Sequence, residues 1–217
     1  SVLGGALAGL ALGGWGWGWL EMPFATAFLW SSSSLIASSG FFWGTLAVLI
    51  SHRWLLFLHP LDWVGVPNLI SFPLVVFLWL FCGILAGLLV LIWSWIAISL
   101  FRIFVRDRSF KYSIYFAICS SSLWGLAEVL LSQSPFFWIG LGVSFLPGDT
   151  WMAGLAGFIG AGGLATIQLL IGWWLWQLFI AFKSRFNWRK IFSIGLIVLI
   201  SLHLIGWNTL KEDATFS

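Results

Sequence analysis

The stretch Leu69–Leu100, LISFPLVVFLWLFCGILAGLLVLIWSWIAISL, decides the fold class of this chain. It contains no Asp, Glu, Lys or Arg, and a helix needs about 20 mostly apolar residues to cross a lipid bilayer. The rest of the sequence agrees, since 61% of its 217 residues are hydrophobic, 8% are charged and the mean hydropathy is +1.03. Soluble domains carry about 25% charged residues. We therefore expect an all-α, polytopic membrane protein.

Seven apolar runs are candidates for membrane-spanning helices. They cover residues 2–20, 23–38, 40–58, 69–100, 113–132, 151–182 and 190–208. The second run is short and rich in Ser, as in a half-span or a tilted hairpin. The fourth and sixth runs exceed a perpendicular crossing, which indicates tilt or projection beyond the bilayer. The sequence thus predicts a bundle of about seven transmembrane helices over 1–210, with 211–217 as the start of a linker.

Basic residues predict the orientation of this bundle. Eight of the ten lie in two connections, and they are Arg102, Arg106, Arg108, Lys111, Lys183, Arg185, Arg189 and Lys190. These connections follow the fourth and sixth runs, so alternating spans place both of them on one side. Connections rich in Lys and Arg face the cytoplasm. We therefore expect the N-terminus in the cytoplasm and the C-terminus on the outer side.

The segment before Leu69, His52–Asn68, reads HRWLLFLHPLDWVGVPN and is unusually polar for this chain. Its two prolines prevent it from continuing as one uninterrupted helix. The polar side chains of His59 and Asp62 should therefore lie at the edge of the bundle, facing water or a partner. Trp63 is suited to the headgroup level of the membrane. His59 and Asp62 alone supply too few ligands for a metal site.

Glu128 is the carboxylate that lies inside a predicted span, in the run 113–132. A charged group at that depth is costly, so it is a functional-site hypothesis by default. The alternative is structural, with Glu128 holding a neighbouring element through a hydrogen bond. The sequence leaves both interpretations open.

Motifs of known chemistry are incomplete in this sequence. Gly142–Phe145, GVSF, is similar to the GxSG element of rhomboid-type proteases, but Phe145 stands where the second glycine should be. Cys82 and Cys119 lie in apolar runs, where we expect neither a disulfide nor a zinc site. The segment 134–149 is aromatic and interrupted by proline, which favours a re-entrant or interface-lying loop. We expect no catalytic site, metal, cofactor or nucleic-acid partner in this chain.

Taken in order, these features resemble the membrane-embedded part of apolipoprotein N-acyltransferases, most closely the cyanobacterial forms. Residues 59–67, HPLDWVGVP, are similar to the family segment HPLxWxGVP. Three weaker elements follow in the family order, namely Leu123-Trp124 with Glu128, the loop Ser134–Trp138 (SPFFW), and Gly160 with Gly163-Leu164. The resemblance covers roughly residues 1–210.

The resemblance implies a function on the outer, periplasmic side of a bacterial inner membrane. The family moves an acyl chain from a phospholipid to the N-terminal amine of a diacylated apolipoprotein. A nitrilase-like domain with a Glu, a Lys and a Cys performs this reaction through a thioester, and in the family that domain follows the seventh span. By this resemblance the catalytic residues would lie beyond Ser217, and the chain would anchor that domain and guide lipid substrates.

The resemblance also suggests which residues line the lipid entrance. They are His59, Asp62, Trp63, Trp124, Glu128, Pro135 and Trp138, and we expect them to contact substrate or support the docked domain. Two positions depart from the family pattern: Leu131 stands in place of an Arg, and the region of Gly172 in place of an Asn. A non-catalytic membrane scaffold of the same family, or a small transporter, are the alternatives.

Overall fold

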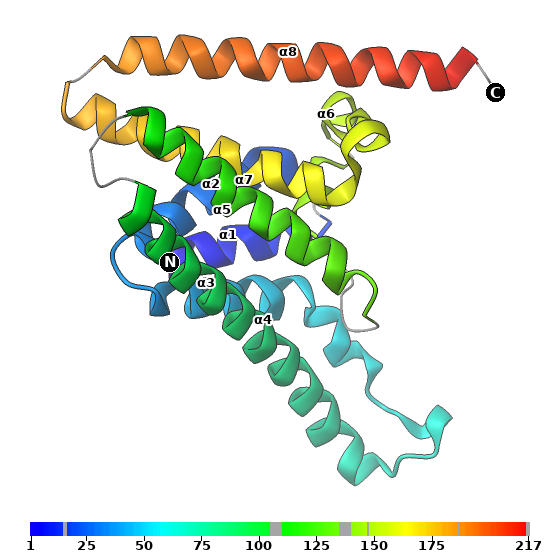
Figure 1. Ribbon diagram of the computed structural model, residues 1–217. Helices are drawn as coiled ribbons and strands as arrows, with labels where there is room; N and C mark the ends of the chain where they lie inside the picture. The colour runs from blue at the N-terminus through cyan, green and yellow to red at the C-terminus, as the bar shows by residue number, and fades with distance from the viewer. Residues whose placement is uncertain (15–16, 105–109, 135–139, 147, 186, 216–217) are drawn as a thin grey trace.

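In the computed structural model, the protein is a bundle of helices (Figure 1). The structure describes all residues except 15–16, 105–109, 135–139, 147, 186 and 216–217. The described α-helices are α1 (Val2–Leu12), α2 (Gly18–Ser33), α3 (Ser38–Ser51), α4 (Asn68–Phe104), α5 (Phe110–Leu131), α6 (Thr150–Gly154), α7 (Ala156–Lys183) and α8 (Trp188–Thr215). Three 3-10 helices join them: η1 (Arg53–Leu58), η2 (Asp62–Val64) and η3 (Leu141–Phe145). The predicted all-α membrane fold is confirmed, and the described residues contain no strand.

Within the described part of the chain, four helices are long and apolar enough to cross a membrane. They are α4, Lys111–Leu131 of α5, α7, and Trp188–Lys211 of α8. Helices α1 and α3 are apolar but shorter, so the predicted count of about seven spans is not confirmed. The run 2–20 in particular is divided, because α1 ends at Leu12 and α2 begins at Gly18. Gly14, with φ +81°, lies in this break in a backbone conformation that favours glycine.

The predicted interruption between His52 and Asn68 is confirmed. Helix α3 ends at Ser51, η1 and η2 follow, and α4 begins at Asn68. Figure 1 shows that residues 53–67 and the first turns of α4 project away from the other helices. The hydroxyl of Ser71, in the first turn of α4, connects this helix to the segment before it. Its oxygen lies 2.8 Å from Leu61 N and 2.9 Å from His59 Nδ1.

Tryptophans connect the helices at the centre of the bundle. Trp30 of α2 donates its indole N–H to Leu169 O of α7, and Trp93 of α4 donates to Ser120 O of α5, each over 2.9 Å. The two rings also contact each other edge to face, with 5.1 Å between the ring centroids. A buried indole usually finds a hydrogen-bond partner for its N–H, and here that partner is a carbonyl on another helix. The aromatic core therefore fixes which helices are neighbours.

Glycines set the closest helix contacts. A Cβ on Gly162 of α7 would meet Gly125 O of α5 at 2.6 Å, and a Cβ on Gly83 of α4 would meet the side chain of Leu49 of α3 at 2.6 Å. Such small residues let helix backbones approach each other in lipid. Helix α8 is different, because it lies along one side of the bundle beside α6 and α7 (Figure 1).

Candidate functional site

A cavity of about 320 Å³ lies between α3, α4 and α5, and we call it the central pocket. Its walls are mainly apolar, with Leu12 of α1 and Leu141 of η3 contributing as well. The polar side chains on its lining include His52 and Glu128. A volume near 300 Å³ with few polar groups falls at the lower end of the range for ligand sites.

Glu128 lies on the wall formed by α5 and is 8% exposed. Its Oε1 accepts two hydrogen bonds, from Trp124 Nε1 at 2.7 Å and from Leu141 N at 2.9 Å. Gly140 packs so closely against the carboxylate that an added Cβ would overlap Glu128 Oε2. The carboxylate thus joins the end of α5 to the start of η3.

Trp124 lies one helical turn before Glu128 and forms another part of the pocket wall. Its ring lies edge to face against those of Trp93 and Trp43, with centroid distances of 5.2 Å and 6.2 Å. Trp43 in turn donates its N–H to Ala25 O at 2.9 Å. Edge-to-face aromatic contacts contribute about 0.5–1.5 kcal/mol each beyond their buried area. The aromatic core therefore holds Trp124 in the position from which it reaches Glu128.

The central pocket opens on the outer surface of the bundle. Part of its lining comes from α4 side chains that are themselves exposed, namely Phe81, Leu85, Leu89 and Ile92. These residues lie on a helix that is apolar and long enough to cross a membrane. The opening would therefore face lipid, and an apolar chain could enter from the side.

His52 is the polar residue of the segment 52–68 that reaches the central pocket. It is 8% exposed and stands directly after α3. Its Nδ1 lies 2.8 Å from Ser51 Oγ, and the Ser51 hydroxyl donates to Ala47 O at 2.8 Å. Since the hydroxyl proton is used in that bond, we assign the proton of the His52–Ser51 contact to Nδ1. His52 was not among the predicted site residues, although its polarity at the end of an apolar run was a usable signal.

The structure brings together only some of the predicted site residues. Trp124 and Glu128 are bonded to each other in the pocket wall. His59, Asp62 and Trp63 lie in the projecting segment, are exposed and do not line the pocket. Asp62 Oδ1 accepts the backbone N–H of Trp63 at 3.0 Å, and His59 contacts Ser71 and Phe72. Their functional roles stay predictions.

Two further predicted residues, Pro135 and Trp138, lie outside the described residues. Leu141 N, which bonds to Glu128, was not predicted as a site group. A backbone donor has no sequence signature, because every residue except proline carries one.

The polar groups that could form a catalytic pair or a metal site bond to other partners in the described structure. The Ser144 hydroxyl donates to Leu141 O at 2.7 Å. A rhomboid-type protease would also need a Ser–His pair, but the described contacts do not join Ser144 to His203, whose Nε2 lies 2.9 Å from Asp149 Oδ2. Within the described ranges, no three His, Cys, Asp or Glu side chains come together as a metal site would require.

Comparison with known proteins identifies the family. An apolipoprotein N-acyltransferase of Prochlorococcus marinus strain MIT 9313 is 48% identical over 214 residues, which are 98% of this chain. The apolipoprotein N-acyltransferase of Prochlorococcus marinus strain SARG is 46% identical over 97% of the chain. Over the region that it spans, this chain belongs to the apolipoprotein N-acyltransferase family. A more distant member, from Nostoc strain PCC 7120, is 25% identical over 89% of the chain.

The chain spans 42% of the length of each of the two Prochlorococcus relatives. No family model matches the sequence. No solved structure matches it either. The family assignment therefore comes from these relatives, and the apolar helices agree with a membrane part of such a protein.

Proposed function

We propose that this chain is the membrane-embedded part of an enzyme that transfers an acyl chain from a phospholipid to the N-terminal amine of a diacylated apolipoprotein. The enzyme works in a bacterial inner membrane, and its bond-making groups belong to a nitrilase-like domain outside these 217 residues. The names of the relatives and the apolar helices support this proposal. The chain itself acts by anchoring that domain and guiding the lipid substrates.

The central pocket is the observation that carries this proposal. Its apolar walls and its exposed rim on α4 suit an acyl chain that moves in sideways from the bilayer. Such a move brings little hydrophobic gain, because the lipid interior is as apolar as the pocket. The benefit is positional: a chain held in a fixed cleft brings its ester to a defined place, and fixed placement of reactants lowers a reaction barrier.

The remaining predicted residues have places in this proposal. Glu128 and Trp124 fix the start of η3 at one end of the pocket, so the pocket keeps its shape while lipid enters and leaves. His59, Asp62 and Trp63 offer an exposed polar and aromatic surface on the projecting segment, for a headgroup or the docked domain. Pro135 and Trp138 are assigned the same role from the family resemblance. The segment 52–68 faces the periplasm in this arrangement.

A pair of neighbouring substitutions on α5 tests the role of the pocket. Ala127 lines the pocket and is exposed, so Ala127→Trp should fill the opening without disturbing the buried core. Leu126→Trp is the matched control, because Leu126 is 56% exposed and does not line the pocket. The complete protein is reconstituted in phospholipid vesicles with a peptide bearing an N-terminal diacylglyceryl-cysteine, and amide formation is followed by mass spectrometry.

Ala127→Trp should lower kcat/KM for the phospholipid by about tenfold or more, as expected when a bound substrate is displaced from its productive position. Leu126→Trp should leave it unchanged. Equal activities of the two variants would remove the pocket from the lipid path. A complete wild-type protein that forms no acyl amide would overturn the enzymatic proposal and favour a non-catalytic scaffold or a transporter.

A further inference from the structure

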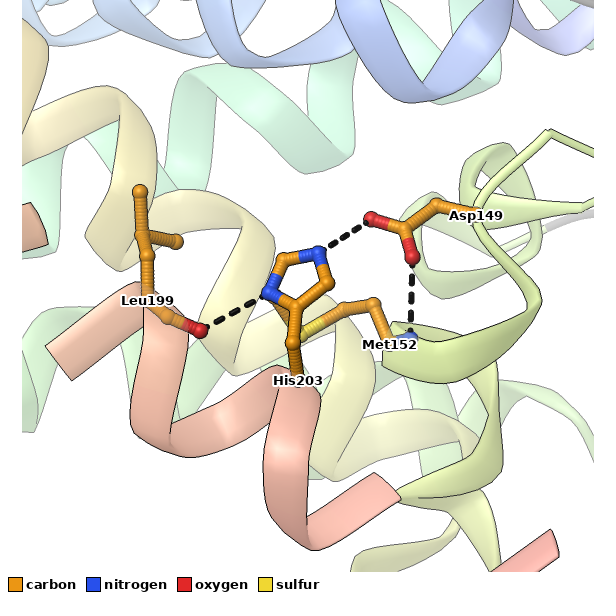
Figure 2. A network of polar contacts seen from close by, with 4 residues as sticks. All are labelled: Asp149, Met152, Leu199 and His203. Atoms are coloured by element: carbon orange, nitrogen blue, oxygen red, sulfur yellow. Dashed lines mark hydrogen bonds and ion pairs between the residues drawn. The ribbon is translucent and has the colours of Figure 1, made fainter. Parts of the chain in front are cut away.

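A polar pair joins α8 to the rest of the bundle at residues that do not line the central pocket. His203 of α8 lies with Nε2 2.9 Å from Asp149 Oδ2 and with Nδ1 2.8 Å from Leu199 O (Figure 2). The other oxygen of Asp149, Oδ1, accepts the backbone N–H of Met152 at 3.0 Å. We call His203 and Asp149 the polar pair.

The hydrogen-bond partner of Nδ1 fixes a proton on that nitrogen of the His203 ring. Leu199 O only accepts hydrogen bonds, so Nδ1 of His203 is a donor. Nε2 faces Asp149 Oδ2, so one proton lies between these two atoms. The side chains are 32% and 13% exposed for His203 and Asp149. Because the pair is partly buried, water screens this hydrogen bond less than it would screen an exposed one.

Helix α8 packs on the bundle through a limited part of its surface, which includes Leu199, Leu202 and Gly206. It contacts α6 and α7, and most of its apolar side chains are exposed. In lipid an apolar helix gains little by docking, so close packing and polar contacts decide where it lies. Near its first residues, Trp174 of α7 donates to Ile191 O at 2.9 Å. Further along the helix, the polar pair is the side-chain hydrogen bond from α8 to another helix or loop among those described.

The same carboxylate also fixes the surface on which α8 packs. Asp149 caps the N-terminus of α6 through Met152 N. Gly206 of α8, one turn after His203, lies directly against this helix, since a Cβ on Gly154 would meet Gly206 O at 2.5 Å. One side chain thus orders α6 and binds α8 to it.

We propose that the polar pair positions the second half of α8, and with it the catalytic domain that follows this helix. The catalytic part of this inference rests on the proposed function, whereas the docking of α8 does not. His203 and Asp149 are positioning residues, because they act through the place of the helix and touch no substrate. Loss of the pair should let the end of α8 move away from α6 and should misplace the active site relative to the lipid in the central pocket.

The docking of α8 can be measured as a distance in the complete protein. Nitroxide labels are attached at Leu146 and Asn208, two exposed positions on the η3 side and on α8. Cys82, Cys119 and the cysteines of the rest of the complete protein are first replaced by Ser. Double electron–electron resonance in lipid nanodiscs should give one narrow distribution of the distance between the two labels when His203 and Asp149 are both present. His203→Leu should broaden or shift it, whereas His203→Gln should keep it narrow, because the amide N–H₂ still donates to Asp149.

Activity of the complete protein forms the second readout. His203→Leu should lower kcat for amide formation by about ten- to a hundredfold, as for a misplaced catalytic group, with KM for the phospholipid unchanged. His203→Gln should restore most of kcat. Ser201→Ala is the matched control on the same helix, since the Ser201 hydroxyl is exposed and its described hydrogen bond goes to Ile197 O of α8 itself.

Each outcome decides part of the proposal. A narrow, unshifted distance in His203→Leu would overturn the docking role whatever the activity. A broadened distance with unchanged kcat would overturn the positioning role. If the wild-type protein forms no acyl amide, the proposed function and the catalytic part of this inference fail together, and the distance still decides the docking.

Discussion

At the scale of single residues, the contacts of Glu128 show how a carboxylate is accommodated in an apolar bundle. One oxygen accepts both the indole N–H of Trp124 and the backbone N–H of Leu141. Hydrogen bonds of this kind offset part of the cost of burying a polar group away from water. The two interpretations that the sequence left open are therefore compatible, because a residue that ties η3 to α5 also shapes one wall of the central pocket.

Two substitutions separate these contributions. Glu128→Gln keeps an oxygen that can accept both N–H groups, so membrane abundance and the free energy of unfolding should stay close to those of the wild type. Glu128→Leu leaves two donors without their acceptor and should lower the free energy of unfolding by about 1–3 kcal/mol for each of them. Unfolding in mixed detergent micelles measures both variants.

The acylation assay completes this comparison. Glu128→Gln should lower acylation by the complete protein without lowering its abundance, because it removes the ionisable group from the pocket wall. Unchanged acylation in this variant would show that acylation does not need the carboxyl group of Glu128 and would leave it a structural residue.

At the scale of elements, the sequence predicted the kind of structure better than its boundaries. The apolar run 69–100 became α4, and the break at 52–68 followed from Pro60 and Pro67. The run 2–20 was predicted as one span because its glycines count as apolar, yet it breaks after Leu12. Hydropathy does not distinguish a glycine in a helix contact from a glycine in a turn.

The site was predictable only where its residues share a helix face. Trp124 and Glu128 are four residues apart, a spacing that places side chains next to each other on a helix. The polar pair of Asp149 and His203 is separated by 54 positions, so only the fold brings it together. The residues His59, Asp62 and Trp63 lie between the apolar runs 40–58 and 69–100, in the projecting segment, and they do not line the pocket.

A prediction at this scale concerns the contact between α5 and α7. A leucine at Gly162 would overlap Gly125 O and the side chain of Val129 and would push the two helices apart. Overpacking of this kind costs about 1–3 kcal/mol, so Gly162→Leu should lower the free energy of unfolding by that amount in micelles. Ala161→Leu is the control, because the side chain of Ala161 is exposed. Equal stability of the two variants would show that this glycine contact is not tight in the membrane.

At the scale of the whole molecule, the membrane orientation predicted from the basic residues has to agree with the direction in which the helices run. Helices α5 and α7 are antiparallel neighbours, as the contacts of Gly125 with Gly162 and of Ser121 with Thr166 show. The basic residues near Lys111 and Lys183 therefore belong to the same end of the bundle, and the projecting segment 53–67 belongs to the other. A lipid that enters beside His52 would reach the pocket from the end opposite to the basic residues.

The positive-inside rule gives this arrangement a direction that can be tested. Each Lys or Arg near an anionic cytoplasmic surface contributes about 1 kcal/mol, so the eight basic residues of the two connections favour one orientation strongly. Single cysteines are placed at Val64 and at Ser184, both exposed, after Cys82, Cys119 and the cysteines of the rest of the protein have been replaced by Ser. A maleimide that does not cross membranes should label Val64→Cys in intact spheroplasts and Ser184→Cys only after permeabilisation. The reverse pattern would place the segment 52–68 in the cytoplasm, away from the side on which the proposed acyl transfer takes place.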